Sequence, residues 1–202
     1  MSKVLIVSTG TANMASVLTA IRRQGYDPTE STSAAEIERA AGVVVPGVGA
    51  FGAAMDRINS ASLRSALIER IDNGQPTMAV CVGMQLLCAS SEESPDSSGL
   101  GVIDDRIERL GAEQRVPHLG WNKVDPPDDS QFLEPGWAYF ANSYRLRKSP
   151  KGWSVSTTRY GDQFISAMER GNVLACQFHP ELSGAWGARV LRRWLAVTGN
   201  AA

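Results

Sequence analysis

The chain has few of the residues that build metal centres and disulfide frameworks, with two histidines and three cysteines among 202 residues. An odd number of cysteines argues against a disulfide scaffold and favours a reducing compartment, so the cytoplasm is the expected location. If Cys81 and Cys88 share one helix, they lie about 10 Å apart, beyond the reach of a disulfide. Because zinc sites need clustered Cys and His ligands, no metal is expected.

Long apolar runs and an excess of charge of either sign are also missing. No apolar stretch approaches the roughly 18 residues that cross a membrane, and the short apolar run near Met1 lacks the cleavage pattern of a signal peptide. The net charge is −1 and no basic block occurs, so neither a membrane nor nucleic acid is an expected partner. With 43% hydrophobic residues, residues 1–202 are expected to fold as a single globular domain.

The first half of the chain alternates short apolar runs with segments of helical spacing. This alternation predicts an α/β fold, a doubly wound and mostly parallel sheet with helices on both faces. The second half contains short strands at hairpin spacing, which predicts a mixed or antiparallel extension. The predicted strands cover residues 4–7, 26–31, 43–45, 78–80, 137–144, 153–160, 164–169 and 173–178, residues 116–124 lead into a further strand, and the predicted helices cover residues 13–23, 34–41, 51–58, 63–71, 84–90 and 183–197.

The segment of residues 76–87 combines a strand, a tight turn and a helical pattern, with Cys81 at the bend. Gly83 keeps side-chain bulk away from this turn. A cysteine at the first turn of a helix meets free backbone N–H groups and the helix dipole, which favour the thiolate, and the same N–H groups can hold an oxyanion. From this segment alone, a buried cysteine at a strand end explains the pattern equally well.

A reactive thiol needs a base, and the candidates are His118 and His179. His179 follows a predicted buried strand, and Glu181 shares its face if the backbone is extended, as Pro180 favours. Glu181 can then hold the imidazole tautomer and support its cation while the imidazole takes the thiol proton. Because Cys81 and His179 both follow carboxyl ends of strands, they are expected to meet. His118 has no carboxylate within four residues and lies in a Pro/Gly-containing segment, so it is predicted to be a structural or surface residue.

Gly47 and Gly49 follow another predicted strand. On their own, these glycines are explained equally well by an ordinary turn. Beside a cysteine at the next strand end, however, the backbone N–H groups of Gly49 and Val82 can form an oxyanion hole. The glycine spacing does not match a phosphate-binding loop.

Taken together and in this order, these motifs resemble the class I glutamine amidotransferases and, more narrowly, the HisH family, the glutaminase subunits of imidazole glycerol phosphate synthase. The resemblance runs from residue 3 to about residue 197. The broader family motifs are residues 46–49, 80–85 and 177–181, and the narrower signs are residues 9–13, 117–122, 139–140 and 143–144.

The resemblance implies a flavodoxin-like amidotransferase fold and a reaction that uses no cofactor. In such a reaction Cys81 attacks the carboxamide of L-glutamine, His179 shuttles protons and Glu181 orients the imidazole. A glutamyl thioester forms, ammonia leaves, and water releases glutamate. The implied substrate-binding residues are Gly47, Gln85, Ser143 and Tyr144.

The resemblance also implies a partner, a (β/α)₈-barrel cyclase of the HisF type. The two subunits would form a heterodimer in which ammonia passes to the cyclase for imidazole glycerol phosphate formation in histidine biosynthesis. The face that carries Asn13, Trp121 and Asn122 would meet this partner.

Four residues depart from the usual pattern of the family. Ala79 replaces a glycine two residues before the nucleophile, Asn142 stands where histidine is common, Leu182 stands where a basic residue is common, and Ser8 replaces an aspartate. The triad is untouched. Three alternatives stay open: a glutaminase that feeds a different synthase, a cysteine hydrolase or protease on a similar fold, and a scaffold without chemistry.

Overall fold

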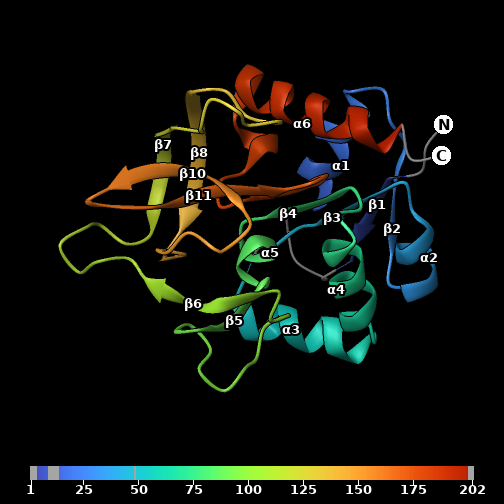
Figure 1. Cartoon of the computed structure of the whole chain (residues 1–202), viewed down its shortest axis with the longest axis horizontal. Helices are drawn as coiled ribbons and strands as arrows, with labels where there is room; N and C mark the ends of the chain where they lie inside the picture. Colours follow the sequence, from blue (N-terminus) through green and yellow to red (C-terminus); the bar gives the residue numbers. More distant parts are fainter. Residues whose placement is uncertain (1–3, 9–13, 48, 200–202) are drawn as a thin grey trace.

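A seven-stranded sheet forms the centre of the computed structural model, which describes residues 4–8, 14–47 and 49–199 (Figure 1). The strand order is β10-β11-β12-β4-β3-β1-β2. The strands from β12 to β2 run parallel, whereas β10 and β11 add an antiparallel edge. The strands are β1 (Val4–Val7), β2 (Pro28–Ser31), β3 (Gly42–Val45), β4 (Thr77–Val80), β10 (Ser154–Tyr160), β11 (Asp162–Arg170) and β12 (Val173–Cys176).

Helices cover both faces of this sheet, and the predicted α/β fold is confirmed. In Figure 1, α1 and α6 lie on one face and α3 and α4 on the other. Every residue of β1, β3, β4 and β12 is buried, which explains why these parallel strands read as continuous apolar runs. The helices are α1 (Met14–Arg22), α2 (Ala34–Arg39), α3 (Phe51–Ser60), α4 (Arg64–Asp72) and α6 (Gly184–Thr198).

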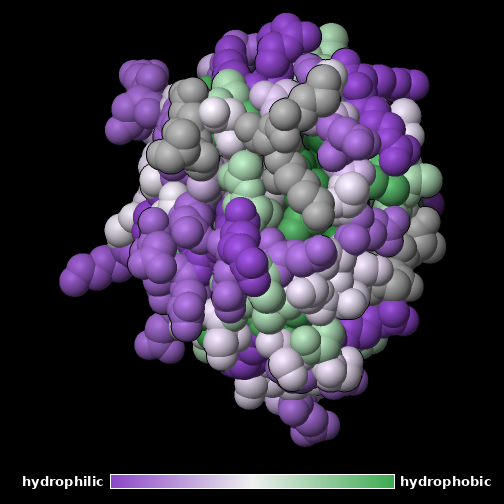
Figure 2. Space-filling model, turned by 90° about the vertical axis from the view of Figure 1, so that its right-hand side faces the viewer, coloured by the Kyte–Doolittle hydropathy of each residue, from purple (hydrophilic) through white to green (hydrophobic). Residues whose placement is uncertain are grey.

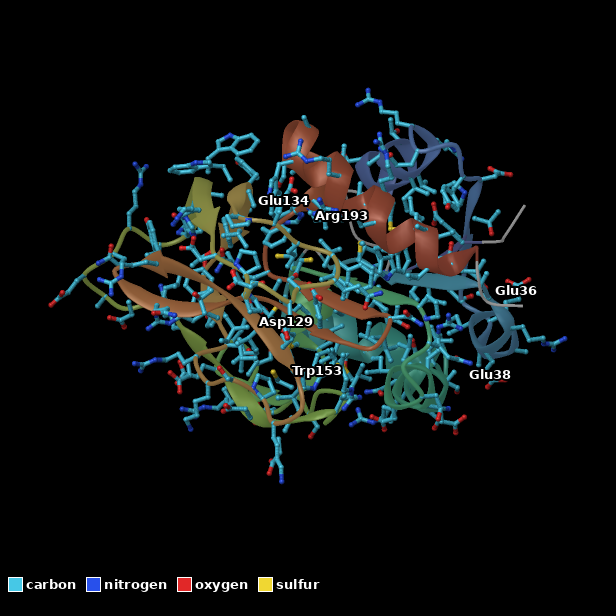
Figure 3. The ribbon with its side chains drawn as sticks, turned by 45° about the horizontal axis from the view of Figure 1, so that its top comes forward. Glu36, Glu38, Asp129, Glu134, Trp153 and Arg193 are labelled. Carbon is cyan, nitrogen blue, oxygen red and sulfur yellow. The ribbon has the colours of Figure 1, made fainter. Side chains whose placement is uncertain are left out.

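In the C-terminal helix α6, the apolar residues that recur at helical spacing in the sequence are the ones that are buried. Its apolar side buries residues at helical spacing, among them Trp186, Val190 and Trp194. On its polar side Arg193 pairs with Glu134, at 2.7 Å between Nη2 and Oε2, and Figure 3 shows the two side chains close together. No helix in the described part of the chain is long and apolar enough to cross a bilayer.

The second half forms two smaller sheets beside the central one. Strands β7 (His118–Val124) and β8 (Gly136–Asn142) pair as an antiparallel ribbon. Strands β5 (Cys88–Ser91), β6 (Ile103–Arg109) and β9 (Tyr144–Arg145) form the other sheet. Antiparallel strands were predicted for this half of the chain, but β5 and β6 were not predicted.

The helix predicted over residues 84–90 is wrong in length. The helix α5 (Val82–Gln85) is a single turn, and the chain then enters β5. The carbonyl of Leu86, which a longer helix would use internally, accepts from the N–H of Leu100 at 2.7 Å. A long-range backbone bond therefore ends the helix. Because Cys88 lies in a strand, the helical spacing assumed for the cysteines does not apply, although all three are free and buried.

The two ends of the molecule differ in surface character. Figure 2 views the side of β2 and α2, where hydrophilic residues cover most of the surface. At the other end, the β7–β8 ribbon exposes large apolar side chains, with exposed fractions of 64% for Leu119, 53% for Trp121 and 58% for Trp137. Three of the four large apolar side chains that are exposed in the described part of the chain therefore lie on the ribbon.

Candidate active site

Cys81 forms a strained elbow directly after β4. Its backbone has φ +54° and ψ −111°, a region that residues with a side chain rarely adopt. A Cβ on Gly83 would stand 2.1 Å from the carbonyl oxygen of Val45, so the close approach of β3 requires glycine. The N–H of Cys81 donates to the carbonyl of Cys176 at 2.7 Å. Neighbouring strands thus hold the elbow in place, as in the nucleophile elbows of hydrolases.

His179 and Glu181 form the pair that the sequence predicted, by a different backbone route. The Nδ1 atom of His179 lies 2.8 Å from Oε1 of Glu181. The intervening backbone is not extended as expected, because a 3₁₀ turn η1 (Pro180–Leu182) follows His179. Pro180 suits the first position of such a turn. The N–H of His179 donates to the carbonyl of Tyr139 at 2.9 Å, which ties the histidine to β8.

The charge state of His179 depends on its two partners. Burial lowers the pKa of His179, but hydrogen bonds with Cys81 and Glu181 outweigh it and raise this pKa to about 10. The imidazole therefore keeps its proton at neutral pH. A protonated imidazole between a thiol and a carboxylate can deliver a proton to a leaving group.

Two glutamines connect the elbow to the strand β9. Gln85 is buried, and its amide nitrogen donates to Oε1 of Gln177 at 2.9 Å and to the carbonyl of Tyr144 at 3.3 Å. Gln177 in turn donates from Nε2 to the sulfur of Cys81 at 3.7 Å. Gln177 belongs to the motif of residues 177–181, but the sequence predicts no role for it. The signal that could have identified it is its position directly after β12, the parallel neighbour of β4.

Of the two N–H groups predicted for the oxyanion hole, those of Gly49 and Val82, the one of Val82 is already engaged. Gly49 has a φ of +98°, a value that favours glycine. The N–H of Val82 donates to the carbonyl of Gly47 at 3.3 Å. A Cβ on Gly47 would stand 2.1 Å from the nitrogen of Gly83, so Gly47 also lies against the elbow. An oxyanion must therefore replace the Gly47 carbonyl as the acceptor for Val82.

The predicted substrate-binding residues Ser143 and Tyr144 lie where β8 gives way to β9. The carbonyl of Tyr144 accepts from Gln85 and, at 3.0 Å, from Nδ2 of Asn142. The carbonyl of Ser143 accepts from the N–H of Leu110 at 2.9 Å. Asn142, a departure from the family pattern, thus braces this junction.

The other departures lie at the elbow and on the surface. Ala79 is fully buried in β4, and the elbow forms with its methyl group present. Leu182 is partly exposed at 38%. Ser8 donates from its backbone N–H to Ser31 at 3.1 Å, continuing the pairing of β1 with β2.

The residues predicted to meet a partner point in different directions. Trp121 is exposed on the outer face of β7, in edge-to-face contact with Tyr139 at 6.2 Å. Asn122 points to the opposite face, since successive side chains alternate along a strand, and donates to the carbonyl of Arg159 at 3.0 Å. Asn13 lies outside the described residues.

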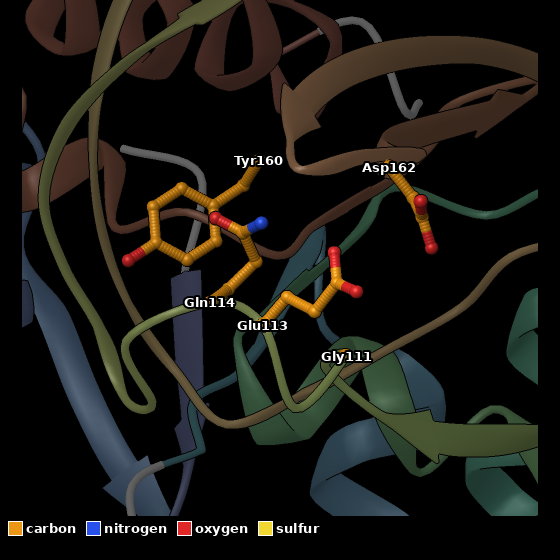
Figure 4. Close-up of a pocket in the computed structure, with 5 residues that line it drawn as sticks. All are labelled: Gly111, Glu113, Gln114, Tyr160 and Asp162. Atoms are coloured by element: carbon orange, nitrogen blue, oxygen red, sulfur yellow. The ribbon is translucent and has the colours of Figure 1, made fainter.

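His118 lies in an aromatic stack. Its ring stacks on Tyr160 at 3.9 Å and on Phe140 at 5.0 Å between centroids. Burial lowers the pKa of His118 to about 4, so the ring is neutral. Tyr160 also lines a surface pocket with Gly111, Glu113, Gln114 and Asp162 (Figure 4), and no residue of the predicted triad lines that pocket. These contacts agree with the structural role predicted for His118.

Comparisons with known proteins identify the family. Residues 10–196 match the family Glutamine amidotransferase class-I. Two similar relatives are named imidazole glycerol phosphate synthase subunit HisH. The one from Symbiobacterium thermophilum is 37% identical over 96% of this chain and 93% of its own length, and the one from Methanothermobacter thermautotrophicus is 38% identical over 96% and 98%. The chain belongs to the class I glutamine amidotransferases, in their HisH family. The resemblance seen in the sequence is confirmed.

One longer relative and two more distant solved structures are also similar to this HisH-family chain. The chain is 42% identical to the chloroplastic imidazole glycerol phosphate synthase hisHF of Arabidopsis thaliana, and it spans 34% of that protein's length. A crystal structure of a glutamine amidotransferase superposes with a TM-score of 0.77 at 22% identity, covering 96% of this chain and 98% of the other. The glutaminase domain of Trypanosoma brucei CTPS with bound acivicin gives 0.73 at 16% identity, covering 99% and 94%. These two likenesses establish the fold.

Proposed function

We propose that this chain acts as a single amidotransferase domain over residues 1–202 and hydrolyses L-glutamine to glutamate and ammonia. Cys81 is the nucleophile, His179 the acid and base, and Glu181 the group that orients the imidazole. The observation that carries the proposal is the continuous series of contacts from Glu181 through His179 to Cys81 at a strained elbow. Such a series activates a thiol for attack on a carbonyl carbon.

The reaction proceeds in two halves. Cys81 attacks as the thiolate, paired with the imidazolium of His179: its sulfur bonds to the carboxamide carbon of glutamine, and the oxyanion that forms is held by backbone N–H groups at Gly49 and Val82. The imidazolium of His179 gives its proton to the leaving nitrogen, so ammonia departs, and a thioester and a neutral imidazole remain. Water then attacks the thioester while His179 takes its proton, and glutamate is released as the Cys81 thiolate and the His179 imidazolium form again. Gly47, Gln85, Ser143 and Tyr144 line the proposed glutamine site.

The proposed recipient of the ammonia is a HisF-type (β/α)₈-barrel cyclase in a heterodimer. Relatives along the whole chain are named as HisH subunits of imidazole glycerol phosphate synthase, and the Arabidopsis protein is named hisHF, with this chain matching a third of it. The exposed apolar side chains Leu119, Trp121 and Trp137 support a docking face on the β7–β8 ribbon.

The glutaminase assignment is tested with Cys81→Ala. This variant should lose glutamine-dependent product and keep ammonia-dependent product when paired with the cyclase, because ammonia generation alone needs the thiol. Loss of both activities would overturn the assignment. Faster turnover of peptide or ester substrates than of glutamine by the wild-type pair would favour a hydrolase instead.

The partner assignment is tested with neighbouring residues on opposite faces of β7. Trp121→Ala should weaken binding to the cyclase about 30-fold, because it removes a large exposed aromatic ring. Asn122→Ala is the matched control and should leave the affinity unchanged, since its side chain lies on the opposite face of β7, toward Arg159 and His118. Wild-type affinity for both variants would exclude this face. If a different synthase stimulated glutamine hydrolysis and the cyclase did not, that synthase would be the partner.

A further inference from the structure

The sulfur of Cys81 has a close neighbour outside the triad, the side chain of Gln177. Gln177 is fully buried and follows β12, whose last residue Cys176 stands opposite Val80 of β4. The parallel register therefore sets Gln177 beside Cys81. The N–H of Gln177 donates to the carbonyl of Ser166 at 2.8 Å, so its backbone is held on the other side as well.

The orientation of the Gln177 carboxamide is determined by Gln85. The amide nitrogen of Gln85 donates to Oε1 of Gln177 at 2.9 Å. Since the oxygen is turned toward Gln85, the amide nitrogen of Gln177 is turned toward the sulfur, at 3.7 Å from it. Both ends of a fully buried amide are thus satisfied, as burial requires. The reverse orientation would set two NH₂ groups against each other.

The other contacts of the sulfur make this donor significant. The imidazolium of His179 faces the sulfur and favours its anion. The carbonyl oxygen of Ala141 lies 3.9 Å from the sulfur, and because a carbonyl can only accept, it favours the neutral thiol. The helix after Cys81 is one turn long and contributes less dipole than the longer helix expected from the sequence. An N–H donor to the sulfur favours the anion, because hydrogen bonds to charged groups are the stronger ones.

We propose that Gln177 is a positioning residue that holds the sulfur of Cys81 in its anionic, attacking state and joins it to Gln85. This inference rests on the proposed function of Cys81 as the nucleophile. Gln85 also donates to the carbonyl of Tyr144, in the proposed glutamine site. Two hydrogen bonds run from Gln85 to the sulfur, so a change at Gln85 is transmitted to the nucleophile through Gln177.

The test measures the pH dependence of Cys81 alkylation by iodoacetamide, with peptide mapping to separate Cys81 from the other cysteines. In Gln177→Leu the pH midpoint of alkylation should rise by about one unit, the equivalent of one lost hydrogen bond to a charged group. In Gln177→Glu the rise should be larger, because a carboxylate repels the thiolate. The kcat for glutamine at neutral pH should fall in Gln177→Leu and recover at higher pH, because the fraction of thiolate falls and then recovers.

Ser166→Ala is the matched control. Ser166 is fully buried, its hydroxyl has no hydrogen-bond partner among the described residues, and its carbonyl is the one that Gln177 contacts. This variant should keep the wild-type midpoint. A wild-type midpoint in folded Gln177→Leu, or an equal rise in Ser166→Ala, would overturn the proposal, because Gln177 would then serve packing alone.

If the Gln177 variants do not fold, Gln85→Met provides a second test of the proposal. It leaves Gln177 in place and removes the group that orients its amide, so the midpoint should rise by less than one unit. An unchanged midpoint would overturn the link to Gln85. Failure of the underlying function has a different signature: glutamine hydrolysis that survives Cys81→Ala removes the nucleophile assignment, whatever the alkylation profiles are.

Discussion

The regions around His179 and His118 bury an imidazole to the same degree and give it opposite properties. The exposed fractions are 4% for His179 and 3% for His118. The pKa of His179 rises to about 10 because hydrogen bonds with Cys81 and Glu181 outweigh burial, whereas burial alone lowers the pKa of His118 to about 4. Burial by itself thus makes a histidine inert, and a paired carboxylate and thiol make it a proton carrier.

The neighbours of each ring explain this difference. His118 lies among Tyr160, Phe140 and Phe164, and its Nδ1 has no hydrogen-bond partner among the described residues. His179 stands at the carboxyl edge of the parallel sheet, where several chain segments end together. The aromatic stack supplies packing, and the sheet edge supplies charged partners.

The largest expected effect separates the two histidines by activity. His179→Asn should lower the rate of glutamine hydrolysis about 10³-fold, because it removes the group that transfers protons. His118→Asn should retain thioester formation, since that ring touches no member of the predicted triad in the contacts described. Steady-state glutamine hydrolysis with the partner present measures both, and melting curves confirm folding. Equal losses would mean that the base is wrongly assigned.

The second prediction removes the carboxylate that distinguishes the two environments. Glu181→Gln should lower the pKa of His179 by about 1–2 units and the rate of glutamine hydrolysis about 10²-fold, since the imidazolium loses its charged partner. NMR titration of the His179 ring measures the first effect. The His118 resonance is an internal control and should not move. A His179 titration unchanged by the substitution would assign its charge to Cys81 alone.

The third prediction concerns the stability of the fold as a function of pH, to which the two histidine rings contribute at opposite ends of the pH range. The pKa of His118 falls from 6.5 to about 4, so the unfolded chain takes up the proton first. The stability that this ring contributes is complete above pH 6.5 and is lost as pH falls toward 4, by about 3 kcal/mol. His118→Phe should flatten that part of the curve in urea unfolding.

The raised pKa of His179 acts in the alkaline direction. Its folded-state pKa of about 10 exceeds the ordinary 6.5, so its contribution is complete below pH 6.5 and is lost as pH rises toward 10. His179→Gln should flatten the alkaline side and leave the acid side unchanged. Flattening on the same side by both histidine variants would contradict the opposite assignments.

The smallest effect tests whether the polar neighbour of His118 matters. Asn122 lies 3.5 Å from Nε2 of His118 and donates to the carbonyl of Arg159. Asn122→Ala should lower the free energy of unfolding by about 1 kcal/mol, the value of one hydrogen bond, without changing the His118 titration. A rise in the pKa of His118 in this variant would show that Asn122 helps to exclude water from the ring.

The parts of the fold that local patterns encode were predictable. Continuous apolar runs identified β1, β3, β4 and β12 because strands covered on both faces need no polar alternation. The strands β5 and β6 were missed, because β6 has only two apolar residues, Ile103 and Ile107, four positions apart among charged ones, and β5 comes directly after a segment of helical spacing. Their pairing joins segments that local patterns do not connect, with Cys88 of β5 opposite Ile103 of β6.

By itself, the sequence determined the family, the parallel half of the sheet and the three chemical groups Cys81, His179 and Glu181, since each depends on residue type and short spacing. The tertiary structure decided how they act. Only packing set the contacts that raise the pKa of His179, the turn that joins it to Glu181 and the amide of Gln177 beside the sulfur. These depend on which atoms surround a side chain, and strands distant in the chain supply those atoms.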